Sequence, residues 1–270
     1  MFQIWLLLRR ALTSYNLRFW RNAHLRLQQT KGGYMKIGII GAMVEEITPL
    51  LEFFKNANLH IQTQNIGGSV YHCINIKQDS VYIAYSKIGK VHSALVATMM
   101  IAHFGCEKIL FSGVAGGLRG DLQVGDLLIA TKLCQHDVDI SAFGHLLGFI
   151  PESAVFIESD SALNAIARSV ADSIGKELKE GIIASGDQFI NDSGKKQWIR
   201  QTFDACAVEM EGASVAVVCA AFDIPFCIFR SISDSADSNA DISFDEFLES
   251  ASKVSARFCI EFIKKLGVGI

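Results

Sequence analysis

The sequence predicts an α/β fold: a single domain built as a three-layer αβα sandwich around a mixed central sheet. From Met35 onward, short apolar runs rich in β-branched residues alternate with longer helical segments. Half of the residues are hydrophobic, which in a chain of 270 residues is enough for a large core without disulfides or structural metals. No linker rich in Pro, Gly or Ser divides this part of the chain, so we expect one domain.

Strands are predicted where a short apolar run ends at glycine or at polar residues. The first run, residues 36–41, reads Lys-Ile-Gly-Ile-Ile-Gly and is typical of a buried strand. Residues 67–77 and 81–86 flank three polar residues, which indicates two strands joined by a turn. In chain order, the remaining strands are predicted at residues 108–112, 126–133, 181–185, 205–208 and 224–232.

Helices are predicted where apolar residues recur at helical spacing or where Ala predominates. Pro49 is compatible with the first turn of one helix, and Asp160 and Ser193 are candidate N-caps of two others. Residues 212–222 are apolar on nearly all sides, which is typical of a buried helix. In chain order, the helices are predicted at residues 45–55, 91–104, 161–176, 195–203, 212–222 and 244–265.

Residues 1–34 are predicted to be an N-terminal extension outside the fold, with the domain spanning residues 35–270. The segment has no Asp or Glu, lacks the features of a signal peptide, and its apolar run is too short to span a bilayer. A basic amphipathic helix on a membrane surface is the alternative. Codons for Lys31-Gly32-Gly33 can form a purine-rich ribosome-binding sequence, so we expect upstream sequence read in frame before Met35. An intact mass from the native host that includes residues 1–34 would contradict this.

The composition argues against several classes of function. A net charge of −3 provides no basic surface for nucleic acid, and we expect no membrane partner. The seven cysteines form neither a CxxC pair nor a Cys/His cluster with zinc spacing. We therefore expect buried, reduced thiols in a cytoplasmic protein without a bound metal.

Acidic residues follow the carboxyl ends of several predicted strands. Glu46 follows the first strand, Glu211 follows residues 205–208, and Asp234 follows residues 224–232. Ligands bind at the carboxyl ends of parallel strands, so these carboxylates meet in one pocket if the strands are mostly parallel. Different surroundings can then separate their pKa values into acid and base roles.

Each of these segments also has a purely structural interpretation. Glu45 and Glu46 can stabilise a helix N-terminus, residues 209–211 can cap the following helix, and Asp234 can cap a turn. The Gly-rich segment 113–117 is predicted as a turn, without the spacing of a dinucleotide-binding motif or the Lys of a P-loop. Structural roles are also the simpler interpretation of four other residues, His136, His145, Phe143 and Phe244.

Seven short motifs occur in order along the chain. They read Gly-Ile-Ile-Gly-Ala-Met-x-x-Glu-Glu, Ser-Lys-Ile-Gly-Lys-Val, Gly-Val-Ala-Gly-Gly-Leu, His-Asp-Val-Asp-Ile-Ser-Ala-Phe-Gly, Ser-Gly-Asp-Gln-Phe-Ile-Asn, Val-Glu-Met-Glu-Gly-Ala and Arg-Ser-Ile-Ser-Asp-Ser-Ala-Asp. With these motifs the chain resembles the bacterial 5′-methylthioadenosine/S-adenosylhomocysteine nucleosidases, from Met35 to roughly Leu266. The resemblance implies a nucleoside phosphorylase-like fold and hydrolysis of the N-glycosidic bond of these nucleosides, with release of adenine. It also implies a homodimer and no cofactor.

The resemblance assigns roles to individual residues. Glu46 matches the carboxylate that activates the attacking water, Asp234 the acid that protonates N7 of the purine, and Glu211 the residue that holds the ribose hydroxyls. Further residues matching the substrate site are Gly116 and Met210 near the ribose, Phe189 and Ile190 at the adenine, and Met43, Ile88, Phe143 and Pro151 at an apolar 5′ pocket. Two residues match positions supplied across a dimer interface, Phe244 and Ile140.

Two positions depart from the family pattern, and alternatives stay open. Val114 stands where many relatives have Ser, and His145 stands where many have Tyr at the 5′ pocket, so 6-amino-6-deoxyfutalosine is an alternative substrate. A purine nucleoside phosphorylase is the alternative enzyme, but residues 42–46 carry two Glu where related phosphorylases have residues that hold phosphate. A nucleoside-binding module without activity would explain the Gly-rich segment but not the converging acids.

Overall fold

Strands and helices alternate along most of the chain in the computed structural model, which describes residues 34–234 and 240–270, with side chains from residue 247 onward in the second range. The strands are β1 (Lys36–Gly41), β2 (Ile61–Ile66), β3 (Ser69–Ile76), β4 (Asp79–Tyr85), β5 (Lys108–Gly117), β6 (Leu127–Gln135), β7 (Ile157–Glu158), β8 (Leu178–Ser185), β9 (Ala205–Glu209) and β10 (Phe226–Asp234). The helices are α2 (Val44–Asn56), α3 (Lys90–Ala102), η1 (Ser141–Phe143), α4 (Ser161–Ser173), α5 (Ser193–Phe203), α6 (Gly212–Phe222) and α7 (Ala240–Lys265). All of them belong to the unit Met35–Ile270, and the predicted extension lies outside the described residues except for Tyr34.

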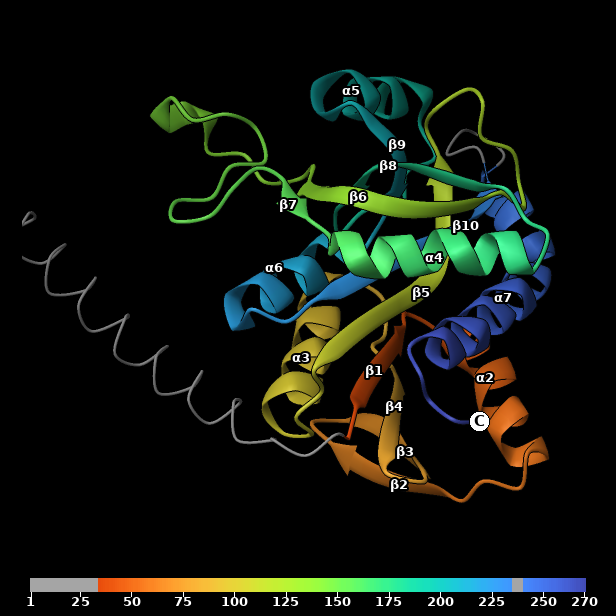
Figure 1. Ribbon diagram of the computed structural model, residues 1–270. Coiled ribbons are helices and arrows are strands. Elements are labelled where there is room, and N and C mark those ends of the chain that lie inside the picture. Colours follow the sequence, from red (N-terminus) through yellow and green to blue (C-terminus); the bar gives the residue numbers. More distant parts are fainter. Residues whose placement is uncertain (1–33, 235–239) are drawn as a thin grey trace, which may run out of the picture. The chain divides into compact units, whose positions relative to one another are not determined.

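The strands form one mixed sheet in the order β10-β6-β8-β9-β5-β1-β4-β3-β2, with β7 beside β6 (Figure 1). Strands β1, β4, β5 and β10 run parallel to one another, and β6, β8 and β9 form a second parallel group. The two groups are antiparallel where β10 pairs with β6 and β5 pairs with β9. Since β5 pairs with both β10 and β9, five strands of the sheet close into a ring.

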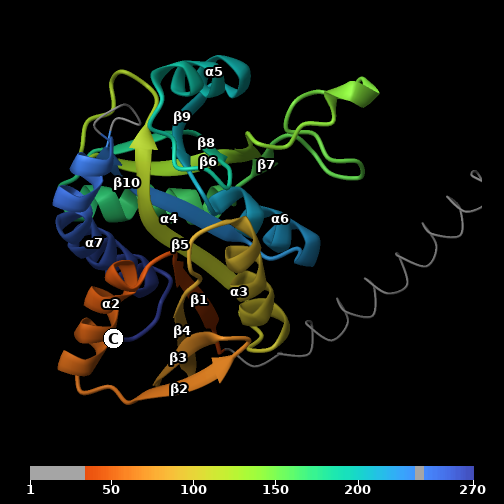
Figure 2. The same cartoon turned by 180° about the vertical axis from the view of Figure 1, so that it is seen from behind.

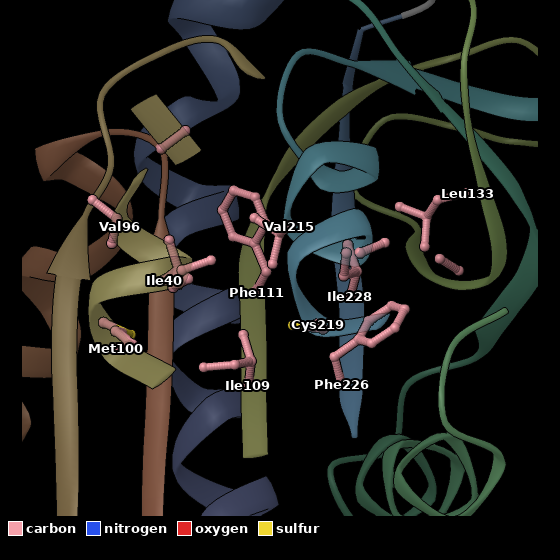
Figure 3. Packing of buried hydrophobic residues seen from close by; sticks show 14 of the residues in the cluster. Ile40, Val96, Met100, Ile109, Phe111, Leu133, Val215, Cys219, Phe226 and Ile228 are labelled. Atoms are coloured by element: carbon pink, nitrogen blue, oxygen red, sulfur yellow. The ribbon is translucent and has the colours of Figure 1, made fainter. Parts of the chain in front are cut away.

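Helices cover both faces of this sheet, which confirms the predicted three-layer αβα architecture (Figures 1 and 2). Side chains of α2, α4 and α7 bury one face, and those of α3 and α6 bury the other. Figure 3 shows the core on the face covered by α3 and α6, where Phe111 and Ile228 of the sheet lie near Val96 of α3 and Val215 of α6. Burial of apolar surface contributes about 25 cal/mol per Å² to the free energy of folding. Because both faces of the sheet are buried in this way, the strands and their ends are held in fixed positions.

The predicted turn at residues 113–117 was wrong, because these residues continue strand β5. Gly116 and Gly117 at its end pair antiparallel with Val208 and Ala207 at the end of β9. This pairing joins the carboxyl ends of the two parallel groups. The acids predicted to converge therefore do so across an antiparallel junction, and not along the single parallel edge that the sequence suggested.

Other differences concern weak local signals. Strand β2 was not predicted, because its sequence Ile-Gln-Thr-Gln-Asn-Ile is mostly polar and exposed at the edge of the sheet. Helix α5 is capped by Asp192, whose carboxylate accepts a hydrogen bond from Lys195 N, and not by Ser193. The predicted cap of α4 is confirmed, since Asp160 Oδ1 accepts from Leu163 N at 2.8 Å.

All seven cysteines lie in the described residues, where each is buried and outside any disulfide, as the sequence predicted. Within the same residues, no helix has both the length and the apolar character needed to cross a membrane.

Candidate active site

One cavity lies at the junction where the ends of β1, β5, β9 and β10 meet. Its lining residues are Ala42, Met43, Glu46, Ile88, Val114, Ala115, Gly116, Gln188, Phe189, Ile190, Val208, Glu209, Met210, Glu211, Ser233 and Asp234. The structure thus brings together the three acids predicted for catalysis. It also places on this cavity six residues predicted to contact substrate, Met43, Ile88, Gly116, Phe189, Ile190 and Met210.

Three of the residues predicted at the 5′ pocket or across the dimer interface do not line this cavity: Phe143, Pro151 and Ile140. Phe143 lies in η1, on the segment between β6 and β7 that projects from the body of the domain (Figure 1), and 82% of its surface is exposed. His145 follows on the same segment and stacks on Phe149 with ring centroids 4.9 Å apart. The side chain of Phe244 lies outside the described residues, although its backbone belongs to α7.

Glu46 is held by its own helix and still faces the cavity. It lies in the first turn of α2, where Oε2 accepts from Ala42 N at 2.5 Å and Met43 N at 3.1 Å. Oε1 accepts from Val114 N at 3.2 Å on the neighbouring strand. Burial raises the pKa of Glu46, while the charge of Arg230 and the three N–H groups oppose that rise. A fixed carboxylate with a raised pKa is suited to accept a proton near neutral pH.

Glu211 precedes α6 and points across the cavity toward the start of α3. Its Oε1 accepts a hydrogen bond from Gly89 N at 2.8 Å. Burial, and next the nearby charge of Glu209, raises the pKa of Glu211 to about 8, against the opposing effects of the Gly89 N–H and Arg230. Both acids of this segment line the cavity, but only Glu209 also caps α6, so residues 209–211 serve the helix and the cavity together.

Asp234 is the last residue of β10, and a β-bulge sets its direction. Ile232 pairs with Ala115 and Asp234 pairs with the next residue, Gly116, so Ser233 is the extra residue of the bulge. Bulges re-aim side chains and are frequent beside active sites. Both Ser233 and Asp234 consequently line the cavity, and Ser233 Oγ donates to Asp234 Oδ2 at 2.8 Å.

A buried ion pair beneath the cavity was missed by the sequence analysis. Arg230 Nη2 lies 2.5 Å from Glu209 Oε2, with only 1% and 3% of the two side chains exposed. Arg230 also donates from Nη1 to the carbonyl of Phe229 at 3.1 Å, and its guanidinium lies 4.1 Å from the centre of the Phe111 ring. Glu209 accepts from Ser185 Oγ and from Gly212 N at the start of α6.

A signal for this pair was present in the sequence. Arg230 interrupts an otherwise apolar strand, and a buried guanidinium requires an acidic partner. Gln188 and Ser233 also line the cavity without having been predicted there. Among the described residues, no group of three or more His, Cys, Asp or Glu side chains is arranged to hold a metal ion.

The fold and the acidic cavity define an α/β protein with a site for acid–base chemistry, and the comparisons assign its family. The family model described as the phosphorylase superfamily matches residues 36–264, and the chain belongs to this family.

Within the family, the chain is similar to characterised nucleosidases. It is 54% identical over 231 residues to the aminodeoxyfutalosine nucleosidase of Helicobacter pylori strain J99, covering 86% of this chain and 99% of the relative. It is 37% identical over 233 residues to the 5′-methylthioadenosine/S-adenosylhomocysteine nucleosidase of Actinobacillus succinogenes, covering 86% of this chain and all of the relative. A crystal structure of a Helicobacter pylori MTAN mutant, with 5′-methylthioadenosine in its active site, superposes with a TM-score of 0.83 at 53% identity, covering 86% and 99% of the two chains.

The substitution Arg230→Met is expected to destabilise the fold strongly, because it leaves the Glu209 carboxylate buried without its cation. Loss of one partner of a buried ion pair costs about 3–5 kcal/mol, measurable as the free energy of unfolding in urea. Lys253→Met removes an exposed helical pair with Glu249 and serves as the control, with little change expected. A loss below about 1 kcal/mol for Arg230→Met would show that the pair does not support the fold.

The raised pKa of Glu211 predicts a pH-dependent stability. Between its ordinary value of 4.5 and about 8, the folded protein holds a proton that the unfolded chain releases. Raising the pH through this range therefore favours unfolding, and Glu211→Gln removes this contribution. We expect the free energy of unfolding of Glu211→Gln, relative to that of the wild type, to increase as the pH rises from about 5 to about 8. A difference between the two proteins that stays constant over this pH range would contradict the prediction.

Proposed function

We propose that the chain hydrolyses the N-glycosidic bond of 5′-substituted adenosines and releases adenine. The observation that carries the proposal is the cavity itself, because three buried acids from distant segments line it together: Glu46, Glu211 and Asp234. The nucleosidase relatives, one of which binds 5′-methylthioadenosine in its active site, support the same reaction.

The proposed reaction separates the tasks of the three acids. Asp234 donates a proton to N7 of the purine while the bond between N9 and C1′ breaks, so that adenine leaves as a neutral base. The ribose becomes cationic, and Glu211 holds its 2′ and 3′ hydroxyls and stabilises the positive charge. Water forms the new bond to C1′ and Glu46 takes its proton, which is the logic of inverting glycosidases. Solvent then restores the proton of Asp234 and removes that of Glu46.

Phosphorolysis, the alternative reaction, has no supporting feature in this cavity. A phosphate nucleophile would lie on the side of Glu46, whose carboxylate would repel it. The guanidinium of Arg230 is paired with Glu209 beneath the cavity. Membership of the phosphorylase superfamily therefore describes the fold, and the acidic lining favours water as the nucleophile.

We propose 6-amino-6-deoxyfutalosine as a further substrate, in addition to methylthioadenosine and adenosylhomocysteine. Relatives named for that activity in Helicobacter pylori and Campylobacter jejuni support this. Hydrolysis of methylthioadenosine or adenosylhomocysteine would serve methionine salvage, and hydrolysis of 6-amino-6-deoxyfutalosine would serve menaquinone biosynthesis. For either role we propose that the enzyme acts in the cytoplasm. The ratio of kcat/KM for 6-amino-6-deoxyfutalosine to that for methylthioadenosine tests the assignment, and a ratio far below one would make methylthioadenosine the main substrate.

A homodimer completes the proposed 5′ pocket. Phe143 and Leu146 are highly exposed apolar residues on the projecting segment, which suits insertion into a partner copy. By resemblance, Ile140 and Phe244 would reach the partner's cavity, near Met43 and Ile88. Light scattering of the active enzyme that gives the mass of a single chain would contradict this. The domain, residues 35–270, is proposed to act without the extension 1–34.

Substitution of the proposed acid or base is expected to abolish adenine release. Each general acid or base contributes about 10²–10⁴-fold in rate, so kcat should fall by that factor in Asp234→Asn and in Glu46→Gln. Binding of the nucleoside, measured by calorimetry, should persist. Release of adenine from methylthioadenosine, without phosphate, is the assay.

Two exposed carboxylates outside the cavity provide matched controls. Glu45→Gln changes an exposed carboxylate in the same helical turn as Glu46, and Asp223→Asn changes an exposed Asp after α6. Both controls should retain wild-type kcat. Full activity of Asp234→Asn would remove the acid assignment, and adenine release that requires phosphate would favour the phosphorylase alternative.

A further inference from the structure

Three charged residues from three different sequence motifs meet beside the cavity in a closed ring of hydrogen bonds. Lys90 Nζ lies 2.6 Å from Asp137 Oδ1. The other oxygen of Asp137 accepts from Asp187 N at 2.9 Å, and Asp187 Oδ1 accepts from Lys90 N at 2.8 Å. The motifs that contain these residues support the family resemblance, but neither the sequence nor the proposed mechanism gives the three residues a task.

The ring connects three segments that are distant in sequence. Lys90 begins α3, Asp137 follows β6, and Asp187 follows β8. The N-cap position of α3 is Gly89, which has no side chain to cap the helix, so Asp187 supplies the capping carboxylate from another segment. Gly89 has a φ of +101°, and a Cβ there would lie 3.0 Å from Asp187 Oδ1. The glycine therefore permits both the conformation and the close approach.

The residues next to the ring belong to the cavity. Gly89 N donates to Glu211 Oε1 at 2.8 Å, and Ile88 lines the cavity on the other side of that glycine. After Asp187, Gln188, Phe189 and Ile190 also line the cavity. The ring thus lies between the wall expected to contact adenine and the carboxylate expected to hold the ribose.

We propose that Lys90, Asp137 and Asp187 are positioning residues that fix the adenine-side segment 188–190 relative to Glu211 before substrate binds. The inference rests on the proposed function and extends it, because it explains how the base and the sugar are held at one fixed separation. The three residues act through Gly89 and the segment 188–190, without touching the substrate themselves.

The surroundings of the ring make it stronger than a surface ion pair. Only 15% of Lys90 and 16% of Asp137 are exposed, so water screens their attraction weakly. Burial alone would raise the pKa of Asp137, but the bonds from Lys90 and from Asp187 N outweigh it and hold this pKa below its usual value. The Asp137 carboxylate therefore stays charged in mildly acidic solution, and the ring stays closed.

The first test removes only the charged end of Lys90. In Lys90→Met the ring opens, and only the bond from Lys90 N to Asp187 Oδ1 still joins the start of α3 to the wall, so KM for methylthioadenosine should rise about tenfold while kcat changes less than about threefold. Lys90→Arg keeps the charge and should restore KM to near the wild-type value. Lys179→Met is the matched control, because it removes a Lys–Glu pair at the opposite end of β8, and its KM should equal that of the wild type.

A second readout separates positioning from a merely structural role. Glu211 is faced by Glu209 and Glu46, which raise its pKa, and by the Gly89 N–H and Arg230, which lower it. If the ring opens, the Gly89 N–H is held less firmly and the pKa of Glu211 rises. The proposed mechanism uses the charged form of Glu211, so kcat/KM should increase as the pH rises through the pKa of Glu211. This increase should occur at higher pH in Lys90→Met and not in Lys179→Met.

Asp187→Ala provides an independent variant, because it removes the cap of α3 and leaves the pair of Lys90 with Asp137 in place. It should reproduce the higher KM and the displaced pH profile. A lower melting temperature in both variants, with KM and pH profile unchanged, would overturn the positioning role. A wild-type enzyme that releases no adenine would overturn the proposed function and this inference together. If the wild type is active and both variants have its KM and its pH profile, only the inference is overturned.

Discussion

The buried ion pair between Arg230 and Glu209 is the interaction on which the site depends. Arg230 belongs to β10 in the first parallel group of strands, and Glu209 ends β9 in the second. The pair therefore ties the two groups together at the antiparallel junction. Glu209 also binds the N-terminus of α6, which fixes the backbone of Glu211 just before that helix. One charged contact thus determines both the strand arrangement and the direction of a cavity carboxylate.

The same pair limits the electrostatic cost of the cavity. Glu46, Glu209 and Glu211 are all buried within one region, and each additional negative charge makes ionisation of its neighbours less favourable. Arg230 opposes this effect at both Glu46 and Glu211. The pKa values of Glu46 and Glu211 nevertheless stay raised, mainly because both carboxyl groups are buried. Such an arrangement lowers the stability of the fold in exchange for reactivity.

The sequence predicted those parts of the fold that depend on local pattern. Strand β1 and helix α6 were predicted with correct bounds, because an apolar run and its length are local properties. The end of β5 was mistaken for a turn, since Gly113 to Gly117 are strand residues only because β9 and β10 pair with them. Strand β2 escaped notice because it is polar and held only by its pairing with β3.

The sequence also predicted part of the site, namely its acids, but not the contacts that hold them. Its acids were recognised because strand ends and family motifs mark them, and the structure places them on one cavity. The partner of Arg230 could not be inferred, because the two residues lie 21 positions apart on strands whose pairing is set by the closed ring of the sheet. The ring of Lys90, Asp137 and Asp187 was equally hidden, since it joins three loops that only the tertiary fold brings together.

The bulge at Ser233 makes the position of Asp234 a matter of residue count. In a regular strand, side chains alternate, and Asp234 would share the face of Ile232, which is packed in the apolar core. Deleting one residue from the end of β10 would leave its composition almost unchanged yet exchange the cavity acid for a neighbouring side chain. Natural variants and engineered forms of this strand should therefore tolerate no change of its length.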